Sequence, residues 1–275
     1  FQRMGTVILQ AVRWKRDVVG STAVFQVIGK GAATTKARHG TITPMNQSHT
    51  TATATLADFY AGDWVDKLDE AKININERDV IASGGAMALG RKVDDQITTV
   101  LDTTGQAIIT LTVTSKATVL ATAIEFAEAA WANDVPNDGQ RYAALTPMMW
   151  EHAMTVPAFA DADFVGAGGL PLTEGAPILT WKSWNGVMWT VHTGLPGIGS
   201  AAAKVFAWHK TAVGFATGAH AGNVAANDAV RAIITYNGER DAHFVNHHMS
   251  SGSVLIDDSG VIEAQYNDTT AVATS

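Results

Sequence analysis

The sequence predicts a mixed α+β fold, because strand-like segments both precede and follow two long helical segments. Apolar runs rich in β-branched residues at 5–12 and 23–28 indicate the first strands. Apolar residues recur every three or four positions over 78–102 and again over 115–133, which is the spacing of an amphipathic helix. Three more strand-like segments close the chain: 230–236, 242–249 and 261–266.

A long polar stretch separates the opening strands from the first helix. Residues 29–48 are rich in Gly, Thr and Lys and show no helical period, which indicates an exposed loop or a long two-stranded excursion. Threonine and alanine then alternate over 50–56, the period of a ribbon that faces solvent. Phe59, Tyr60 and Trp64 follow as aromatic anchors.

The first helix carries one apolar stripe and is expected to begin at a cap, Asn76 or Asp79. The stripe consists of Ala82, Ala86, Leu89, Val93, Ile97 and Val100. At 1.5 Å per residue, about 23 residues form a helix about 34 Å long, which is long for a globular protein. The charged residues between the stripe positions, including the paired acids Asp94 and Asp95, are expected to face solvent.

The second helix is expected to follow a cap at Thr114 or Ser115 and to end before a turn at 134–139. Its expected apolar face consists of Ala117, Leu120, Ala121, Ile124, Ala127 and Trp131. A buried strand at 142–145 then leads into Thr146-Pro147, the N-cap and first residue of a short helix. The next signals are a loop at 158–175, a strand at 205–208, a short helix or bend at 210–216 and a turn at 257–260.

Asn185-Gly186 is the strongest short hairpin signal in the chain. Three tryptophans lie in this hairpin: Trp181, Trp184 and Trp189. Tryptophan clusters stack against sugars or bases, or they anchor cores and interfaces. Since no basic groove lies between these residues, the sequence favours the second use.

Charge is distributed unevenly along the 275 residues. Residues 1–40 contain seven Lys or Arg and one acid, a charge of +6, so the remainder must carry −13 to reach the overall −7. This asymmetry indicates a basic arm that meets an acidic body or a polyanion. Only 16% of residues are charged, against a usual ~25%. Such a chain either covers much of its surface with neighbouring molecules or is an ordinary soluble domain.

Cysteine is absent, so disulfides are excluded. No apolar run reaches the ~18 residues that would span a bilayer, so no membrane contact is expected. Phe1 is not an initiator methionine, so the chain is expected to be a processed or trimmed product.

The sequence contains no catalytic signature: it lacks a phosphate-binding loop, a dinucleotide fingerprint and a Gly-x-Ser-x-Gly elbow. The chain is therefore not expected to be an enzyme or to bind a cofactor. Asp161 and Asp163 are spaced like glycosidase acids but are expected to be solvated. His243, His247 and His248 indicate surface or inter-subunit histidines rather than a metal site, because only two of them share one face of a strand.

The order of these features resembles the major capsid proteins of tailed bacteriophages, which have the Hong Kong 97-type shell fold, and most closely the short-tailed phage branch. The segments that carry the resemblance are Val24 to Ile28 with the Gly/Lys/Thr stretch after it, Thr50 to Glu70, Asn76 to Asp95, Arg141 to Pro147, Leu195 to Gly197 and Phe206 to Gly214. The likeness is one of order and spacing.

The resemblance implies an N-terminal arm, an extended β loop, a peripheral domain with a long spine helix, and an apical domain. Their implied bounds are 1–23 for the arm, 24–75 for the loop, 76–114 with 240–275 for the peripheral domain, and 115–239 for the apical domain. It also implies a major capsid protein that assembles as hexamers and pentamers into an icosahedral shell around the double-stranded DNA of a tailed phage.

The implied partners are further copies of the chain, scaffold or decoration proteins, a portal, and packaged DNA in non-specific contact. The implied location is the virion, after assembly in the host cytoplasm. Candidates for inter-subunit contact are Arg13, Lys15, Arg16, Lys30, Lys36, Arg38, Phe59, Tyr60, Trp64 and Asp66, and candidates for spine-helix packing are Leu89, Val93 and Ile97. The arm and the threonine-rich ribbon are expected to lack partners within their own subunit, because an isolated two-stranded ribbon is marginally stable.

Two alternative functions remain at this point. An encapsulin-like nanocompartment shell would have the same fold but would enclose cargo enzyme instead of a genome. A secreted carbohydrate-binding or hydrolytic protein, the less favoured alternative, would use the tryptophan hairpin with Asp161 and Asp163.

Overall fold

The computed structural model describes residues 7–72, 76–111, 115–160, 181–219 and 231–269. Its helices are α1 (Lys67–Lys72), α2 (Glu77–Leu101), α3 (Lys116–Ala132), α4 (Pro147–Met154) and α5 (Pro157–Ala160), with short 3₁₀ helices η1 (Leu9–Ala11) and η3 (Asp258–Gly260). Its strands are β1 (Arg13–Val18), β2 (Thr22–Ile28), β3 (His49–Thr55), β4 (Ala57–Asp66), β5 (Ile109–Thr110), β6 (Arg141–Leu145), β7 (Lys182–Trp184), β8 (Val187–Val191), β9 (Ala203–His209), β10 (Val213–Gly218), β11 (Arg231–Asn237), β12 (Ala242–Leu255) and β13 (Val261–Tyr266). The expected mixed α+β fold is confirmed.

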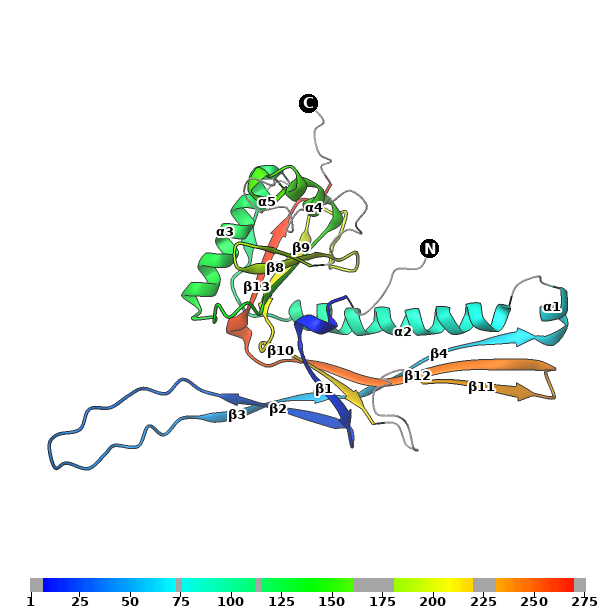
Figure 1. Cartoon of the computed structure of the whole chain (residues 1–275), viewed down its shortest axis with the longest axis horizontal. Coiled ribbons are helices and arrows are strands. Elements are labelled where there is room, and N and C mark those ends of the chain that lie inside the picture. Colours follow the sequence, from blue (N-terminus) through cyan, green and yellow to red (C-terminus); the bar gives the residue numbers. More distant parts are fainter. Residues whose placement is uncertain (1–6, 73–75, 112–114, 161–180, 220–230, 270–275) are drawn as a thin grey trace.

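The first sheet is built around the 14-residue strand β12. Residues 242–248 of β12 pair with both β4 and β11, and its last residues pair with β10. Strand β10 pairs in parallel with β1, whereas the three pairings of β12 are antiparallel. The result is a long, narrow sheet that runs beneath α2 (Figure 1).

Helix α2 lies along this sheet and is held there by both apolar and polar contacts. Leu89, Val93 and Ile97 are buried, whereas Ala86, which belongs to the same expected stripe, is exposed. The side chain of Gln96 accepts a hydrogen bond from Ser251 Oγ at 2.7 Å. Near the other end of the helix, a Cβ added at Gly85 would collide with the His247 ring, so the close approach of helix and strand requires glycine there.

The second sheet has the strand order β5-β13-β9-β6-β8-β7, and α3 and α4 pack beside it (Figure 1). Its β7–β8 hairpin turns at Asn185 and Gly186, which have φ angles of 50° and 73°. Positive φ at both central residues is what a type I′ hairpin turn requires, so the expected hairpin is confirmed. The expected caps of α3 and α4 are also found, since the hydroxyls of Ser115 and Thr146 accept backbone N–H groups in the first turns of these helices. Asn76 stands at the N-cap position of α2, but its side chain makes no capping hydrogen bond.

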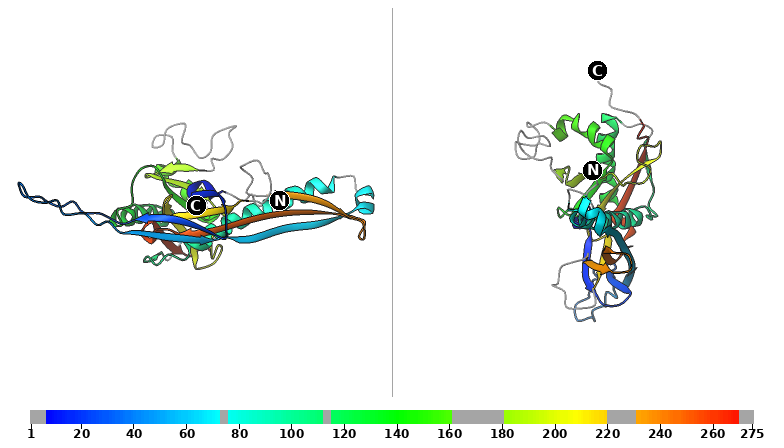
Figure 2. Two further views of the ribbon diagram at one scale, coloured as in Figure 1. Left: turned by 90° about the horizontal axis from the view of Figure 1, so that it is seen from below. Right: turned by 90° about the vertical axis from the view of Figure 1, so that its right-hand side faces the viewer.

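Strands β2 and β3 form a separate two-stranded ribbon. Phe25 and Ala54, on one face of the ribbon, are buried with Ala216 of β10 in a small apolar cluster. Beyond this base, residues 29–48 form neither helix nor strand and project away from the rest of the chain (Figures 1 and 2). Of the two alternatives for this segment, the exposed loop is confirmed and the two-stranded excursion is wrong, because the strand pairing stops at Ile28 and His49.

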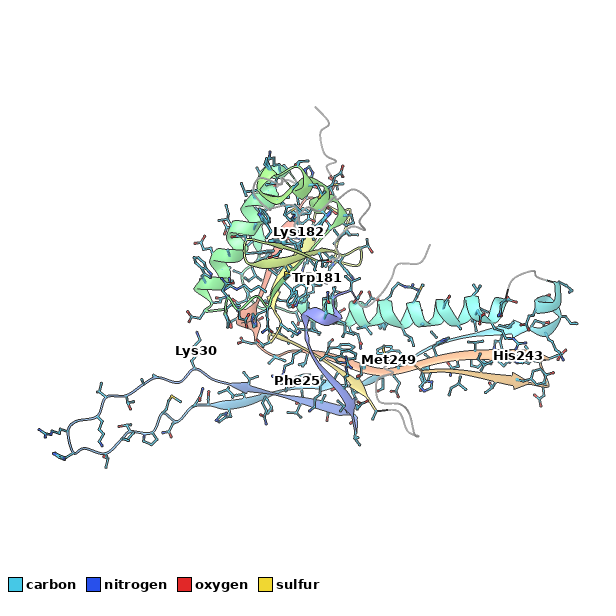
Figure 3. All side chains as sticks on the ribbon, in the orientation of Figure 1. Phe25, Lys30, Trp181, Lys182, His243 and Met249 are labelled. Carbon is cyan, nitrogen blue, oxygen red and sulfur yellow. The ribbon has the colours of Figure 1, made fainter. Side chains whose placement is uncertain are left out.

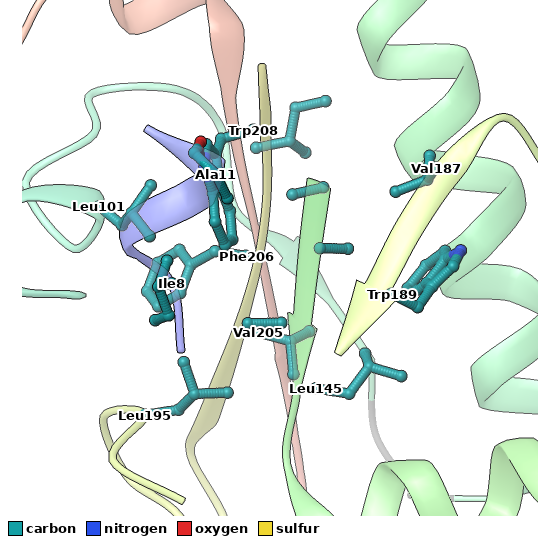
Figure 4. Close-up of a cluster of buried hydrophobic side chains, with 14 of the residues drawn as sticks. Ile8, Ala11, Leu101, Leu145, Val187, Trp189, Leu195, Val205, Phe206 and Trp208 are labelled. Atoms are coloured by element: carbon teal, nitrogen blue, oxygen red, sulfur yellow. Dashed lines mark hydrogen bonds between the residues drawn. The ribbon is translucent and has the colours of Figure 1, made fainter. Parts of the chain in front are cut away.

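The main core joins the two sheets and includes the start of the described chain (Figure 4). Ile8 and Ala11 are fully buried, and the indole N–H of Trp208 donates to the Ala11 carbonyl at 2.8 Å. Leu101, at the end of α2, and Phe206, in β9, belong to the same cluster. The chain therefore begins its described course inside the body of the molecule.

Three local predictions are wrong. Part of the segment expected as a strand over 5–12 is the 3₁₀ helix η1, and the short helix or bend expected at 210–216 is largely strand β10. The loop expected at 158–175 starts within helix α5, and positions 161–175 lie outside the described residues. Every residue of β10 is buried, so it lacks the alternation of apolar and polar residues by which sequence reveals a half-exposed strand. Its place is fixed by pairing with β1 and β12, which lie far from it in sequence.

The buried face of α3 is also different from the expected one. The helix buries Thr118, Val119, Thr122, Ala123, Phe126 and Ala130. Leu120, Ile124 and Trp131, which the periodicity assigned to the apolar face, are exposed. Because α3 is apolar on more than one side, periodicity alone cannot decide which side packs on the sheet.

Candidate assembly surfaces

The tip of the 29–48 loop is basic and has few contacts with its own chain. Lys36 and Arg38 are exposed, and neither has a hydrogen bond or ion pair within the described part of the chain. Ile42 is 74% exposed. The two arms of the loop are linked near the tip by one side-chain bond, from Thr34 Oγ1 to the Thr43 carbonyl at 3.2 Å. The loop thus presents cationic and apolar groups to solvent.

The root of this loop, at Lys30 just after β2, is attached by one ion pair to the domain that contains α3 and the second sheet. Lys30 Nζ lies 2.6 Å from Asp134 Oδ2, in the turn after α3, and Figure 3 shows Lys30 directed toward that domain. The hydrogen bond and positive charge of Lys30 hold the pKa of Asp134 below its usual value. Both side chains are largely exposed, so solvent screens this pair and it contributes little to stability.

The basic residues of the N-terminal segment lie on a strand rather than on a free arm. Arg13, Lys15 and Arg16 are exposed on β1. The guanidinium of Arg16 lies 3.8 Å from the centre of the Trp14 ring, and that of Arg13 lies 5.8 Å from the Phe25 ring. The expectation that this segment lacks partners within its own subunit is wrong, because β1 pairs with β10 and Ile8, Ala11 and Val12 before it are buried.

A buried aspartate on α2 holds the start of the described chain. Asp94 is fully buried, and its carboxylate accepts the backbone N–H groups of Val7 and Ile8 at 3.2 and 3.3 Å. His192 Nε2 lies 3.2 Å from the same carboxylate. Because the backbone N–H of Gly194 donates to His192 Nδ1, the ring proton is assigned to Nε2, which donates to Asp94.

The expectation that Asp94 faces solvent is therefore wrong, although its neighbour Asp95 is exposed. A signal for Asp94 was present in the sequence. It lies four residues after Gly90, three before Ile97 and seven before Leu101, all of which are buried on α2. A carboxylate at that spacing is on the packed side of the helix and needs donors there.

The aromatic candidates on β4 divide between the two faces of the sheet. Phe59 lies on the α2 side, with Lys92 Nζ 5.3 Å from its ring centre. Trp64, five residues later, lies on the opposite side. It packs on Phe244 at a centroid distance of 4.6 Å, and the guanidinium of Arg240 lies 4.6 Å from its ring.

Tyr60 shares the outer face with Trp64 and is 70% exposed. Asp66, at the end of β4, accepts the backbone N–H of Leu68 at 2.8 Å and so caps α1. Asp58 and Asp63 are also exposed on this strand, which pairs only with β12 among the described residues. Strand β4 therefore presents an acidic, partly aromatic edge.

The remaining candidates for chemistry are accounted for by packing. His247 is buried under α2, where its Nδ1–H donates to the Ala61 carbonyl at 3.2 Å, so the expected surface role is wrong for this residue. Within the described ranges, no three His, Asp or Glu residues lie close enough to hold a metal ion. Trp189 is buried and Trp184 packs between it and Phe159. Asp161 and Asp163 lie outside the described residues.

A buried polar cluster at the start of α4 has a structural role. Thr146 Oγ1 hydrogen-bonds with the hydroxyl of Tyr266 and donates to Asp268 Oδ1. The same Thr146 oxygen accepts the backbone N–H of Met149, and so caps the helix. Burial is the main cause that raises the pKa of Tyr266.

No described helix is both long and apolar enough to span a bilayer.

The described residues thus form a projecting basic loop and an acidic strand edge, and their candidate reactive side chains do not come together in one site. The family model for phage capsid proteins matches residues 1–268. The chain belongs to the phage capsid protein family. It is a major capsid protein, a structural protein of the virion shell.

Solved capsid structures share the fold of this capsid protein at low sequence identity. The capsid structure of cyanophage P-SCSP1u aligns with a TM-score of 0.73 and 16% identity, covering 96% of this chain and 89% of that one. The cyanophage Pam1 capsid aligns with a TM-score of 0.67 and 12% identity, covering 98% and 93%. The Ralstonia phage GP4 capsid aligns with a TM-score of 0.66 and 11% identity, covering 100% and 93%. No curated protein matches the sequence.

Proposed function

We propose that this capsid protein has the Hong Kong 97-type fold and assembles as hexamers and pentamers into an icosahedral shell around the double-stranded DNA of a tailed phage. The observation that carries the proposal is the 29–48 loop, which projects from the body with a basic tip that has no partner within the described chain. A loop of this length gains contacts only from another molecule. The family match makes further copies of the chain the first candidates.

The four expected parts are proposed with one amendment. Residues 24–75 form the extended loop, 76–114 and 240–275 the peripheral domain with α2 as its spine, and 115–239 the apical domain. Residues 1–23 are the N-terminal arm, but residues 7–18 of this arm belong to the body of their own subunit. Strand β10 lies within the proposed apical range and yet pairs with β12 of the proposed peripheral domain.

Charge complementarity supports a contact between the loop tip of one copy and β4 of the next. Lys36 and Arg38 supply the positive side, and Asp58, Asp63 and Asp66 supply an exposed negative side. In a ring, such unlike surfaces meet head to tail around a closed circle of subunits. Tyr60 and Trp64 on the same strand would provide the apolar part of the contact.

The exposed residues Arg13, Lys15 and Arg16 are proposed for sequence-independent attraction to packaged DNA, which would weaken as salt rises. Scaffold or decoration proteins and a portal are the further partners proposed for such a shell, with assembly in the host cytoplasm. The protein is proposed to act without catalysis. An encapsulin-like compartment is not favoured, because the family match is to phage capsid proteins. Trp189 is buried and Trp184 packs against it and against Phe159, which argues against the sugar-stacking surface on which the secreted alternative depended.

Electron microscopy of the purified protein tests the proposal. We expect closed shells, built from rings of six and five subunits, when the protein is concentrated alone or with its scaffold. Gel filtration with light scattering should show loss of the 29.0 kDa subunit as shells form. Monodisperse subunits under every assembly condition would contradict the proposed function.

A further inference from the structure

Helix α3 has two apolar faces, of which the described chain covers one. Val119, Ala123 and Phe126 are buried against the body. Leu120, Ile124 and Trp131 are 43%, 55% and 68% exposed, and their spacing of four and seven residues places them along one side of the helix. These three residues are called the α3 outer stripe below.

An apolar stripe of this kind is unusual for a helix at a permanent solvent boundary. A helix that faces water carries polar residues on its outer side, whereas one that is apolar all round is covered on all sides in the working protein. A tryptophan exposed to this extent is characteristic of an interface anchor. The α3 outer stripe therefore has the character of a surface that is covered on assembly.

The position of α3 indicates which side of the subunit would be covered. In two perpendicular views, α3 lies on the side toward which the 29–48 loop projects (Figures 1 and 2). The ion pair between Lys30 and Asp134 joins the root of that loop to the turn that follows α3. A molecule that binds the loop near its root would thus stand next to α3.

From these observations we infer that the α3 outer stripe is an inter-subunit contact, covered by a second copy of this chain in the assembled shell. The inference rests on the proposed function and adds a surface to it that the loop does not provide. The covering copy is the same neighbour that receives the loop, because loop root and stripe lie on one side of the subunit.

The size and charge of the stripe fit a second copy better than a separate stable partner. An aromatic side chain buries about 150–250 Å², so three apolar residues supply only part of the ~800 Å² that each partner contributes to a standard interface. The stripe can therefore contribute only together with other contacts, such as the loop. The exposed residues Glu125 and Glu128 border it, so the covering surface would be apolar at its centre and basic at its rim.

The absence of cysteine allows a direct test. Ile124→Cys places a single thiol on the stripe, and Ile198→Cys places one at an exposed position of similar kind outside α3. We expect maleimide to label both residues in unassembled subunits. In shells, residue 124 should be labelled at least tenfold more slowly than in free subunits, and residue 198 should not be slowed to this extent. A benzophenone photo-crosslinker on residue 124 should give a product of twice the chain mass.

The outcomes separate this inference from the function on which it rests. Shells that form normally but leave residue 124 as reactive as in free subunits would overturn the inference and leave the shell proposal standing. Crosslinks to a different virion protein, or protection that requires such a protein, would likewise overturn it. Absence of shells from the unaltered chain would overturn the proposed function and the inference together.

A second variant keeps the test independent of labelling. Ile124→Asp should leave the circular dichroism spectrum and melting temperature of the subunit unchanged, because the side chain is exposed. It should reduce the yield of shells at least tenfold, because a carboxylate would be buried without a partner in the contact. Ile198→Asp is the matched control and should assemble as the unaltered chain does. Equal yields from the two variants would contradict the inference.

Discussion

At the scale of single residues, the buried carboxylate of Asp94 holds two distant segments of the chain together. Its two carboxylate oxygens receive donors from two separate regions, the start of the described chain and the segment after β8. Each of these donors would be left without an acceptor if the carboxylate were removed. Burial makes such a loss costly, since no water replaces the missing acceptor.

We predict that Asp94→Asn lowers the free energy of unfolding of the subunit by about 1–3 kcal/mol, the usual cost of an unsatisfied buried polar group. The amide has the same shape, but its NH₂ group would face donors that now meet an oxygen. Urea unfolding followed by tryptophan fluorescence measures the change. Asp95→Asn, on the exposed neighbour, should change stability by less than about 1 kcal/mol. Equal effects of the two substitutions would contradict the assigned role.

At the scale of elements, turns and caps were predictable and the packing partners were not. Asn185-Gly186, Ser115 and Thr146 act through neighbours a few residues away, so their signals are complete in the local sequence. The strand β10 and the buried face of α3 depend on residues far along the chain, and local periodicity does not contain that information. Asp94 is a mixed case: its spacing from Ile97 and Leu101 placed it on the packed side of α2, but its donors, which make a buried carboxylate tolerable, are 86 or more residues away.

The turn after α2 provides a second test at this scale. Asp258, in η3, accepts hydrogen bonds from the Thr104 hydroxyl at 2.7 Å, the Gly105 N–H at 3.0 Å and the Gln106 amide at 3.0 Å. Burial acts to raise the pKa of Asp258, but these hydrogen bonds outweigh it and hold the pKa below its usual value. The ionised carboxylate therefore ties the turn after α2 to the start of β13.

We predict that Asp258→Asn is less stable than the unaltered subunit by about 1 kcal/mol at pH 7, because neutral hydrogen bonds are weaker than charged ones. A depressed pKa stabilises the fold above the unfolded value of about 3.9, and this contribution is lost as the pH falls through the lower folded value. The difference should therefore begin to shrink as the pH falls below about 4. Urea unfolding from pH 7 to pH 3 measures it, with Asp58→Asn as an exposed control. A constant difference over this range would contradict the role of the charge.

At the scale of the whole molecule, the body is held together by a buried apolar core, whereas the loop is not. The body buries its apolar residues in one main cluster that joins both sheets. The loop at 29–48 buries little and exposes the basic residues Lys36 and Arg38. Its composition alone predicted an exposed excursion. Of the receiving surface proposed above, the resemblance named Tyr60, Trp64 and Asp66, whereas Asp58 and Asp63 are found only from the exposure of β4.

We predict that the double substitution Lys36→Glu with Arg38→Glu slows assembly at least tenfold at low salt, because the loop tip would then repel the acidic edge of β4. The subunit itself should fold as before, since both residues are exposed. Light scattering follows assembly, and the effect should shrink as salt rises from about 0.05 to about 0.5 M. Lys67→Glu with Lys72→Glu makes the same change in net charge on α1. An equal delay from this control would assign the effect to net charge instead of the loop.

The ribbon β2–β3 and the loop that it carries are attached to the body by one buried apolar contact and one exposed ion pair. Phe25 and Ala54 fix its base in an apolar cluster, whereas Lys30 and Asp134 hold its root through an exposed ion pair that solvent can replace. The outer part can therefore tilt relative to the body without disturbing any buried side chain. Identical subunits could thus meet their neighbours at slightly different angles in a curved shell. Only residues 29–48 would have to shift to accommodate these differences.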